Sequence, residues 1–361
     1  MKKILLLALA PLTLSLHAAF IMEKNKPLTK IQVTSNNEDI PVLTTQEPST
    51  TAPNIIEEDS TTLGKKIFEI NFTRHPVGIY TVQMHEEDFR TYEGENLYYQ
   101  NHDGSWMYGT DGPGNTVSIV EDENEKVLQV LYKKGEIHLG NSGFQSLAAL
   151  PKNNRPKEDP YNPQEVTLIY YVKFKTGFHW TTGGKLPGLA GGIAPAGSAI
   201  IGSDRLNNGF SARFMFHKLT SSEGVEMPSS LIGYIYHPGR EGTDGQSVYG
   251  AGSYMSTTKP TTSFTDRDKS NLFQFETNKW YKIQQTIKAN TPNKSDGTMK
   301  VWINDQLATN YGNMKYIADG KHGKYSVDRL LFSTFYGGGT DDYKPTRDTY
   351  TLFKNIQVFI K

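Results

Sequence analysis

A single lysine stands between glycines and a proline in the segment GGKLPGL, residues 183–189. The segment follows a strand-like run, LIYYVKFKTGFHW, and its glycines and proline are typical of turns. We therefore interpret it as a turn-rich loop that presents the ammonium of Lys185, where it can bind an anion. The alternative interpretation is a surface turn with a solvated lysine.

Two strand-like segments further along carry other polar groups, FSARFMF (210–216) and LIGYIYH (231–237). Side chains alternate between the faces of a strand, so the phenylalanines of the first segment share one face and Arg213 stands on the other, beside Ser211. By the same alternation Tyr234 and Tyr236 share a face of the second segment. If the two strands are neighbours, these four side chains line one surface; otherwise the tyrosines are ordinary residues of an amphipathic sheet.

The order GGKLPGL, FSARFMF, GYIYH and FSTFYGGG (332–339) resembles polysaccharide lyase family 14, the metal-independent lyases that cut alginate and related polyuronates. The resemblance extends from about Ile67 to the C-terminus. It implies that Lys185 is the lysine that recognises substrate, that Ser211 and Arg213 form the family's S-x-R pair, and that the tyrosines form its Y-x-Y pair. All five are expected to be catalytic residues.

The implied reaction removes the C5 proton of a uronate and expels the 4-linked sugar. The C6 carboxylate must be neutralised for that proton to leave, and Lys185 and Arg213 suit this task. A tyrosine whose pKa lies below the ordinary value near 10 can take the proton. We assign this role to Tyr236, with Tyr234 either hydrogen-bonding to the leaving oxygen or supplying its proton. The scheme requires no metal and no cofactor.

Three further residues are expected to bind substrate. Gln145 lies in GFQS, which loosely matches a Gly-x-Gln-Phe-like stretch of the family. His217 and His237 flank the two motif strands and either assist proton transfer or lie on the rim. The histidines show no metal-binding spacing, so we expect no metal site.

Short runs rich in Val, Ile, Tyr, Phe and Thr alternate with Gly, Asn, Asp and Pro from residue 65 to residue 361. This alternation of strand-forming runs and turn residues predicts an all-β domain, an antiparallel β-sandwich or jelly roll with a concave substrate groove. Residues 117–132 and 300–308 are expected to form hairpins, and residues 280–290 and 351–361 further strands.

The N-terminus begins with two lysines and a short apolar run that ends near Ala18-Ala19, typical of a signal peptide over residues 1–19. Residues 20–64 are polar and low in aromatics, as in a flexible leader. The protein is therefore expected to be secreted or periplasmic, to lack a membrane span and to be a monomer. With 38 basic and 38 acidic residues and no cysteine, the composition favours neither nucleic acid nor an anionic membrane as a partner. An anionic polysaccharide must then be held by a local basic site.

Two other functions compete. A lectin-like, non-catalytic sandwich would use Trp106, Trp180 and the tyrosines as sugar platforms, and a structural envelope domain would have no activity at all. A glycoside hydrolase would need paired carboxylates, yet the one dense acidic run, residues 121–125, reads as a solvated hairpin tip.

Overall fold

The computed structural model describes the greater part of the chain from residue 63 onward. The described residues are 63–89, 116–139, 142–151, 165–196, 204–218, 229–238, 246–247 and 273–361. The predicted signal peptide and nearly all of the predicted leader, as well as Trp106, lie outside them. No helix in these ranges is long and apolar enough to cross a membrane.

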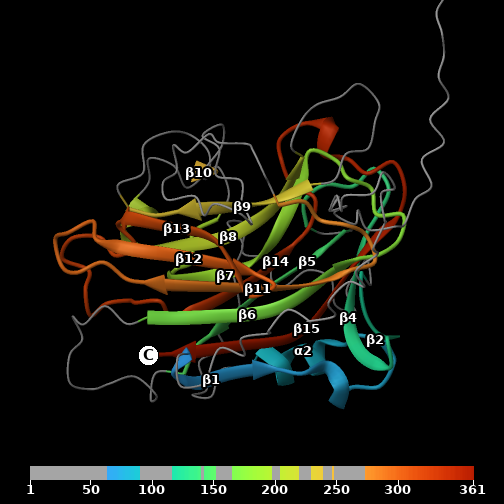
Figure 1. Cartoon of the computed structure of the whole chain (residues 1–361), viewed down its shortest axis with the longest axis horizontal. Helices are drawn as coiled ribbons and strands as arrows, with labels where there is room; N and C mark the ends of the chain where they lie inside the picture. The colour runs from blue at the N-terminus through green and yellow to red at the C-terminus, as the bar shows by residue number, and fades with distance from the viewer. Residues whose placement is uncertain are drawn as a thin grey trace, which may run out of the picture. The chain divides into compact units, whose positions relative to one another are not determined.

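The strands form two antiparallel sheets, as the sequence predicted (Figure 1). The nine-stranded sheet has, in spatial order, β13 (Gln306–Met314), β12 (Gly297–Ile303), β11 (Trp280–Lys288), β6 (Glu165–Phe174), β15 (Thr349–Ile360), β4 (Glu125–Tyr132), β3 (Val117–Asp122) and β2 (Gly78–Ile79), with β1 (Lys65–Ile70) also paired to β15. The six-stranded sheet has β10 (Gln246–Ser247), β9 (Ser229–Tyr236), β8 (Gly209–Lys218), β7 (Gly183–Gly192), β14 (Arg329–Thr334) and β5 (Phe144–Ala149).

One aromatic core joins the two sheets. Alternate residues of β8, among them Phe214 and Phe216, are fully buried in it, and the rings of Phe174 on β6 and Phe216 lie 5.4 Å apart edge to face. The rings of Phe332 on β14 and Phe353 on β15 make a similar contact at 5.0 Å. Because the core takes one face of the six-stranded sheet, the polar residues that alternate with these aromatics stand on the opposite face, which we call the outer face.

Both predicted hairpins are present. β3 and β4 meet at Glu123 and Asn124, and β12 and β13 meet at Asn304 and Asp305. All four turn residues have φ between 50° and 66°, the left-handed values that a two-residue hairpin turn of the primed type requires. Residues 121–125 are thus a hairpin tip, as expected, and Asp122 and Glu123 both bind Lys173 Nζ at 2.8 Å.

The segment GGKLPGL is a strand, so its interpretation as a loop was wrong. It forms most of β7, paired to β8 on one side and to β14 on the other. The pairing Leu186↔Phe214 is followed by Leu189↔Ala212, which places one extra residue on β7 as a bulge. A Cβ on Gly188 would lie 2.1 Å from the carbonyl oxygen of Ala212, so this position must be glycine for the strands to pair.

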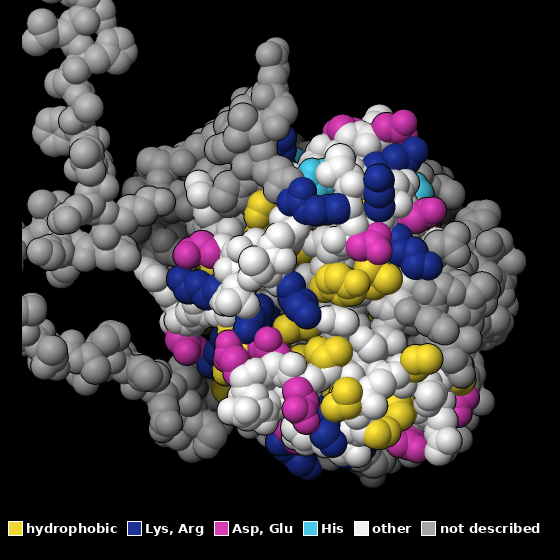
Figure 2. Space-filling model, turned by 90° about the vertical axis from the view of Figure 1, so that its right-hand side faces the viewer, with side chains coloured by type: hydrophobic (Ala, Val, Ile, Leu, Met, Phe, Trp, Pro, Cys, Tyr) yellow, Lys and Arg dark blue, Asp and Glu magenta, His cyan; other side chains and the backbone are white. Residues whose placement is uncertain are grey.

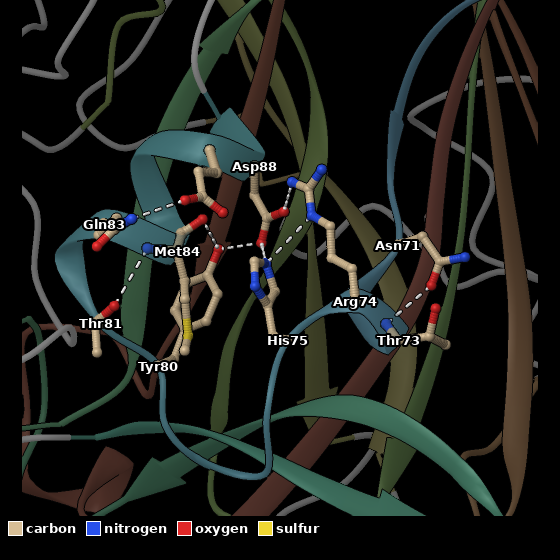
Figure 3. A network of polar contacts seen from close by, with 10 residues as sticks. Asn71, Thr73, Arg74, His75, Tyr80, Thr81, Gln83, Met84 and Asp88 are labelled. Carbon is tan, nitrogen blue, oxygen red and sulfur yellow. Dashed lines mark hydrogen bonds and ion pairs between the residues drawn. The ribbon is translucent and has the colours of Figure 1, made fainter.

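A small helical layer, which the sequence did not reveal, covers the edge of the molecule at β5. It consists of η1 (Phe72–Arg74) and α2 (Val82–Phe89), and further short helices are η4 (Asp204–Asn208) and η5 (Asp341–Tyr343). The carboxylate of Asp88 on α2 has no exposed surface and binds Arg74, His75 Nε2 at 2.9 Å and Tyr80 Oη at 2.5 Å (Figure 3). We call these four residues the Asp88 cluster; they tie the helix to the segment before it.

Candidate active site

Strands β7, β8 and β9 lie side by side and bring the predicted residues to the outer face. Arg213 is directly opposite Tyr234, and Ser211 is opposite Tyr236. On the other side of β8, Lys185 pairs with Met215. The predicted alternation of faces along 210–216 and 231–237 is therefore confirmed, and the core holds the residues expected behind them.

Lys185 is buried, with 6% of its surface exposed. Its Nζ lies 3.1 Å from Met215 Sδ, 3.4 Å from the carbonyl oxygen of Gly337 and 3.9 Å from the ring centre of Tyr234. A solvated surface lysine, the alternative interpretation, is thus wrong. The Lys185 ammonium is therefore held by a thioether, a carbonyl oxygen and an aromatic face.

Arg213 is 2% exposed and is the largest fully buried side chain among those described. Its Nη1 donates to Ser333 Oγ at 3.0 Å, and its guanidinium carbon lies 5.6 Å from the ring centre of Tyr234. Its Nε, also buried, has no hydrogen-bond partner, and no carboxylate of the described residues pairs with the guanidinium. A buried cation in this condition carries an uncompensated desolvation cost, which an anionic ligand would offset.

The two tyrosines form a hydrogen-bonded pair. Their hydroxyl oxygens are 3.1 Å apart, and their rings meet edge to face with centres 5.4 Å apart. Tyr234 is the one whose ring faces both cations. Because a hydroxyl both donates and accepts, the pair can pass a proton from one oxygen to the other.

Gln145 on β5 belongs to the same surface. It pairs in register with Ser333 on β14, and Ser333 Oγ donates to Gln145 Oε1 at 2.9 Å. Gln145 is thereby linked through Ser333 to Arg213. Its predicted contact with substrate stays a prediction, but its place beside the cations fits that role.

Ser211 and the histidines are placed differently. Ser211 Oγ donates to the carbonyl oxygen of Pro195 at 2.6 Å, which fixes the segment after β7; its catalytic role stays a prediction. His217 is on the outer face beyond Met215, whereas His237 follows Tyr236 at the opposite end of the strand pair. The structure therefore does not bring the two histidines together.

His217 Nδ1 donates to the carbonyl oxygen of Lys218 at 2.8 Å, and His237 Nδ1 donates to the carbonyl oxygen of Pro238 at 2.7 Å. Burial, with a contribution from the Lys185 ammonium, lowers the pKa of His217. The same two causes lower the pKa of His138. Both rings are therefore neutral at neutral pH, and the positive charge of the site comes from Lys185 and Arg213.

Sequence reasoning missed three contributors to the site: Met215, Ser333 and the Gly337 carbonyl. The signal for the first two was available. Strand alternation places Met215 on the same face as Arg213, and it turns Ser333 to the face away from its neighbour in sequence, the core residue Phe332. The Gly337 contact comes from a segment distant in sequence from Lys185, and no local pattern predicts it.

On the face shown in Figure 2, basic and acidic side chains lie interspersed, in keeping with the balanced composition. No group of three or more His, Cys, Asp or Glu in the described ranges could hold a metal ion. An anionic ligand at the site would meet the two buried cations, Lys185 and Arg213.

Trp180, proposed above as a sugar platform of a lectin-like protein, does not lie on the surface. It is 7% exposed and belongs to the core, stacked at 6.4 Å on Phe275. That assignment is wrong, because the residues after β6 turn the indole inward among aromatic neighbours.

Fold and site together define a class: an antiparallel β-sandwich that carries buried cations and paired tyrosines on the outer face of one sheet. A model of the family described as polysaccharide lyase 14 matches residues 120–356. The chain belongs to this family, as the resemblance implied, and is a polysaccharide lyase. No curated protein was found that matches it in sequence.

Solved structures share the fold. The alginate lyase Aly36B is 19% identical, with 82% of this chain and 97% of that chain covered and a TM-score of 0.57. The PL-14 alginate lyase of Aplysia kurodai is 20% identical, with 82% and 100% covered and a TM-score of 0.56. A variant of Aly36B with a lysine and a methionine changed to alanine, in complex with an alginate trisaccharide, has a TM-score of 0.58 at 17% identity, with 82% and 98% covered.

Proposed function

We propose that this protein is an exported lyase that cleaves 1,4-linked polyuronate by β-elimination, with alginate as the first polymer to test and glucuronan as the second. The observation that carries the proposal is the buried Arg213 guanidinium, which has no carboxylate partner among the described residues and lies beside Lys185 and two hydrogen-bonded tyrosines. Alginate comes first because the similar structures include alginate lyases with bound alginate oligosaccharides.

In the proposed reaction, the C6 carboxylate of a uronate residue replaces the missing counter-ion of Arg213. The planar guanidinium suits the two carboxylate oxygens, and Lys185 adds a second positive charge. Neutralising the carboxylate makes the C5 proton removable, because charge that develops towards an enolate is then stabilised.

The tyrosine pair moves the protons. Tyr236, acting as its phenolate, takes the C5 proton at Oη, the C–H electron pair forms the C4–C5 double bond, and the C4–O bond to the preceding sugar breaks. Tyr234 supplies a proton to the leaving oxygen. The 3.1 Å contact between the two hydroxyls supports this division, because it allows the proton taken by one tyrosine to return to the other.

The decisive experiment is an ultraviolet assay for unsaturated uronate. Purified protein is incubated with alginate, polymannuronate, polyguluronate and glucuronan across a range of pH. Absorbance should rise with at least one polymer, and the Arg213→Ala variant, the matched control, should give no comparable rise. If the wild-type protein produced no rise in absorbance with any of the four polymers, the proposal would be overturned.

The proposal also covers export, the division of the chain into domains and the oligomeric state of the enzyme. We expect the signal peptide of residues 1–19 to be removed, residues 20–64 to act as a leader and residues 65–361 to form the lyase domain. N-terminal sequencing of protein secreted by an expressing host should begin just after Ala18 or Ala19, and gel filtration should give the size of a monomer. A retained N-terminus or a larger particle would contradict these points separately.

A further inference from the structure

A chain of three hydrogen-bonding side chains crosses the outer face of the six-stranded sheet. Arg213 Nη1 donates to Ser333 Oγ at 3.0 Å, and Ser333 Oγ donates to Gln145 Oε1 at 2.9 Å. All three side chains are buried, with exposed fractions of 2%, 0% and 5%. Such a chain inside a protein has a direction that is set by which group can only donate.

The direction follows from the arginine. A guanidinium has only N–H donors, so Ser333 Oγ must accept from it, and its own hydrogen is then directed at Gln145. Gln145 must receive that hydrogen with its oxygen, which turns the amide nitrogen Nε2 the other way. Nε2 donates to none of the described residues. The hydroxyl of Ser333 thereby fixes the orientation of the Gln145 amide, with Oε1 towards Ser333 and Nε2 pointing away from it.

The backbone makes room for this chain. Arg213 is on β8 and Ser333 on β14, with β7 between them. The guanidinium therefore spans β7, and it does so where β7 carries its bulge: the unpaired positions between Leu186 and Leu189 face Arg213. Gly188 lies there, and a Cβ on it would come within 2.7 Å of the Arg213 Cα. A larger residue would displace the strand that Arg213 must cross.

We propose that Ser333 is a positioning residue that orients Arg213 and the Gln145 amide together, so that guanidinium and Nε2 both donate to oxygens of one bound uronate. The inference rests on the proposed function and deepens it. It assigns to Ser333, a residue in no predicted contact with substrate, a role in recognising the acid sugar through its two neighbours.

The test is a double-mutant cycle. Ser333→Ala should raise KM about tenfold with a smaller change in kcat, because one oriented hydrogen bond to the substrate is lost. Ser333→Thr keeps the hydroxyl and should restore most of the affinity. In the Gln145→Ala background, Ser333→Ala should cost less than it does alone, since residues that act through each other are not additive.

Binding is measured separately from turnover. Calorimetric titration of an alginate oligosaccharide into the Tyr236→Phe protein, with and without Ser333→Ala, should show weaker binding in the double variant. Ser146→Ala is the matched control: Ser146 is next to Gln145 but faces the core, where its hydroxyl bonds His85 Nε2 at 2.7 Å. It should change stability and leave KM unaltered.

The outcomes separate the two proposals. If wild-type protein neither binds nor cleaves any uronate polymer, the proposed function fails. If wild-type protein is active but Ser333→Ala has wild-type KM, or its effect adds fully to that of Gln145→Ala, the positioning role of Ser333 is refuted while the lyase function stands.

Discussion

The Asp88 cluster and the Arg213 site are both buried polar networks, yet they are built on opposite plans. In the Asp88 cluster a carboxylate with no exposed surface is bound by an arginine, a histidine and a tyrosine (Figure 3). At the Arg213 site a buried guanidinium has one hydroxyl partner, an orphaned Nε and no described carboxylate. The first network is complete within the chain; the second is incomplete without a ligand.

This difference separates a structural network from a functional one. Removing a partner from a completed buried network leaves an uncompensated charge and destabilises the fold. Removing the cation from an incomplete network removes a desolvation cost that the fold itself bears, so stability changes little while binding is lost. The predictions below test this contrast.

The largest effect is expected for Tyr236→Phe, which deletes a proton-transfer group. Turnover of polyuronate should fall by about three orders of magnitude, within the range for loss of a general base. The ring and its packing against Tyr234 remain, so the urea midpoint should barely move. Kinetic and unfolding measurements on the same sample check both points. An active Tyr236→Phe protein together with an inactive His217→Ala or His237→Ala protein would assign the base to a histidine.

Lys185→Ala and Arg213→Ala should each lower kcat/KM by about two to three orders of magnitude, because each removes charge stabilisation in the transition state. Arg213→Lys should restore only part of it, since a point charge replaces a planar fork. Thermal unfolding should show Arg213→Ala to be close to wild type in stability. A marked loss of stability with near-normal rates would reverse our comparison of the two networks.

Asp88→Asn is the counterpart in the completed network. It leaves Arg74 and His75 without their carboxylate, and we expect a loss of about 3 kcal/mol in the free energy of unfolding. Turnover of the folded fraction should stay within about twofold of wild type. Denaturant titration measures the loss of stability, and initial rates at low temperature measure the turnover of the folded fraction. Should activity fall and stability hold, the Asp88 cluster would belong to the site.

The smallest effect concerns pH. Burial lowers the pKa of His85 from 6.5 to about 3. Above pH 6.5 the ring is neutral in both folded and unfolded states; between 6.5 and about 3 only the unfolded state takes a proton, so stability falls as the pH is lowered. Well below pH 6.5 the slope due to this residue is about 1.4 kcal/mol per pH unit. His85→Gln, compared with wild type in urea titrations at several pH values, should flatten the curve; parallel curves would contradict the assignment.

Much of this molecule could be predicted from its sequence, because strand alternation is a local property. The facing of Arg213, Tyr234 and Tyr236 followed from spacing alone once the strands were recognised. The β7 strand was not recognised, since glycine and proline normally interrupt strands, and only the neighbouring β8 backbone explains their presence. The Asp88 cluster was missed for a related reason: its members come together through a short helix with little amphipathic pattern.

The bulge in β7 lets Lys185 and Leu189 face opposite sides of the sheet although four residue steps separate them. Regular alternation over these four steps would turn both side chains to the same face, so that either Leu189 would leave the core or Lys185 would enter it. β7 takes four residue steps from Lys185 to Leu189, whereas β8 takes three from Met215 to Ala212. The extra step on β7 allows the two side chains to face opposite sides. A deletion of one residue between them would leave three steps, over which plain alternation still separates the two faces, whereas an insertion of one residue into a strand that keeps its bulge would turn either Lys185 or Leu189 to the wrong side.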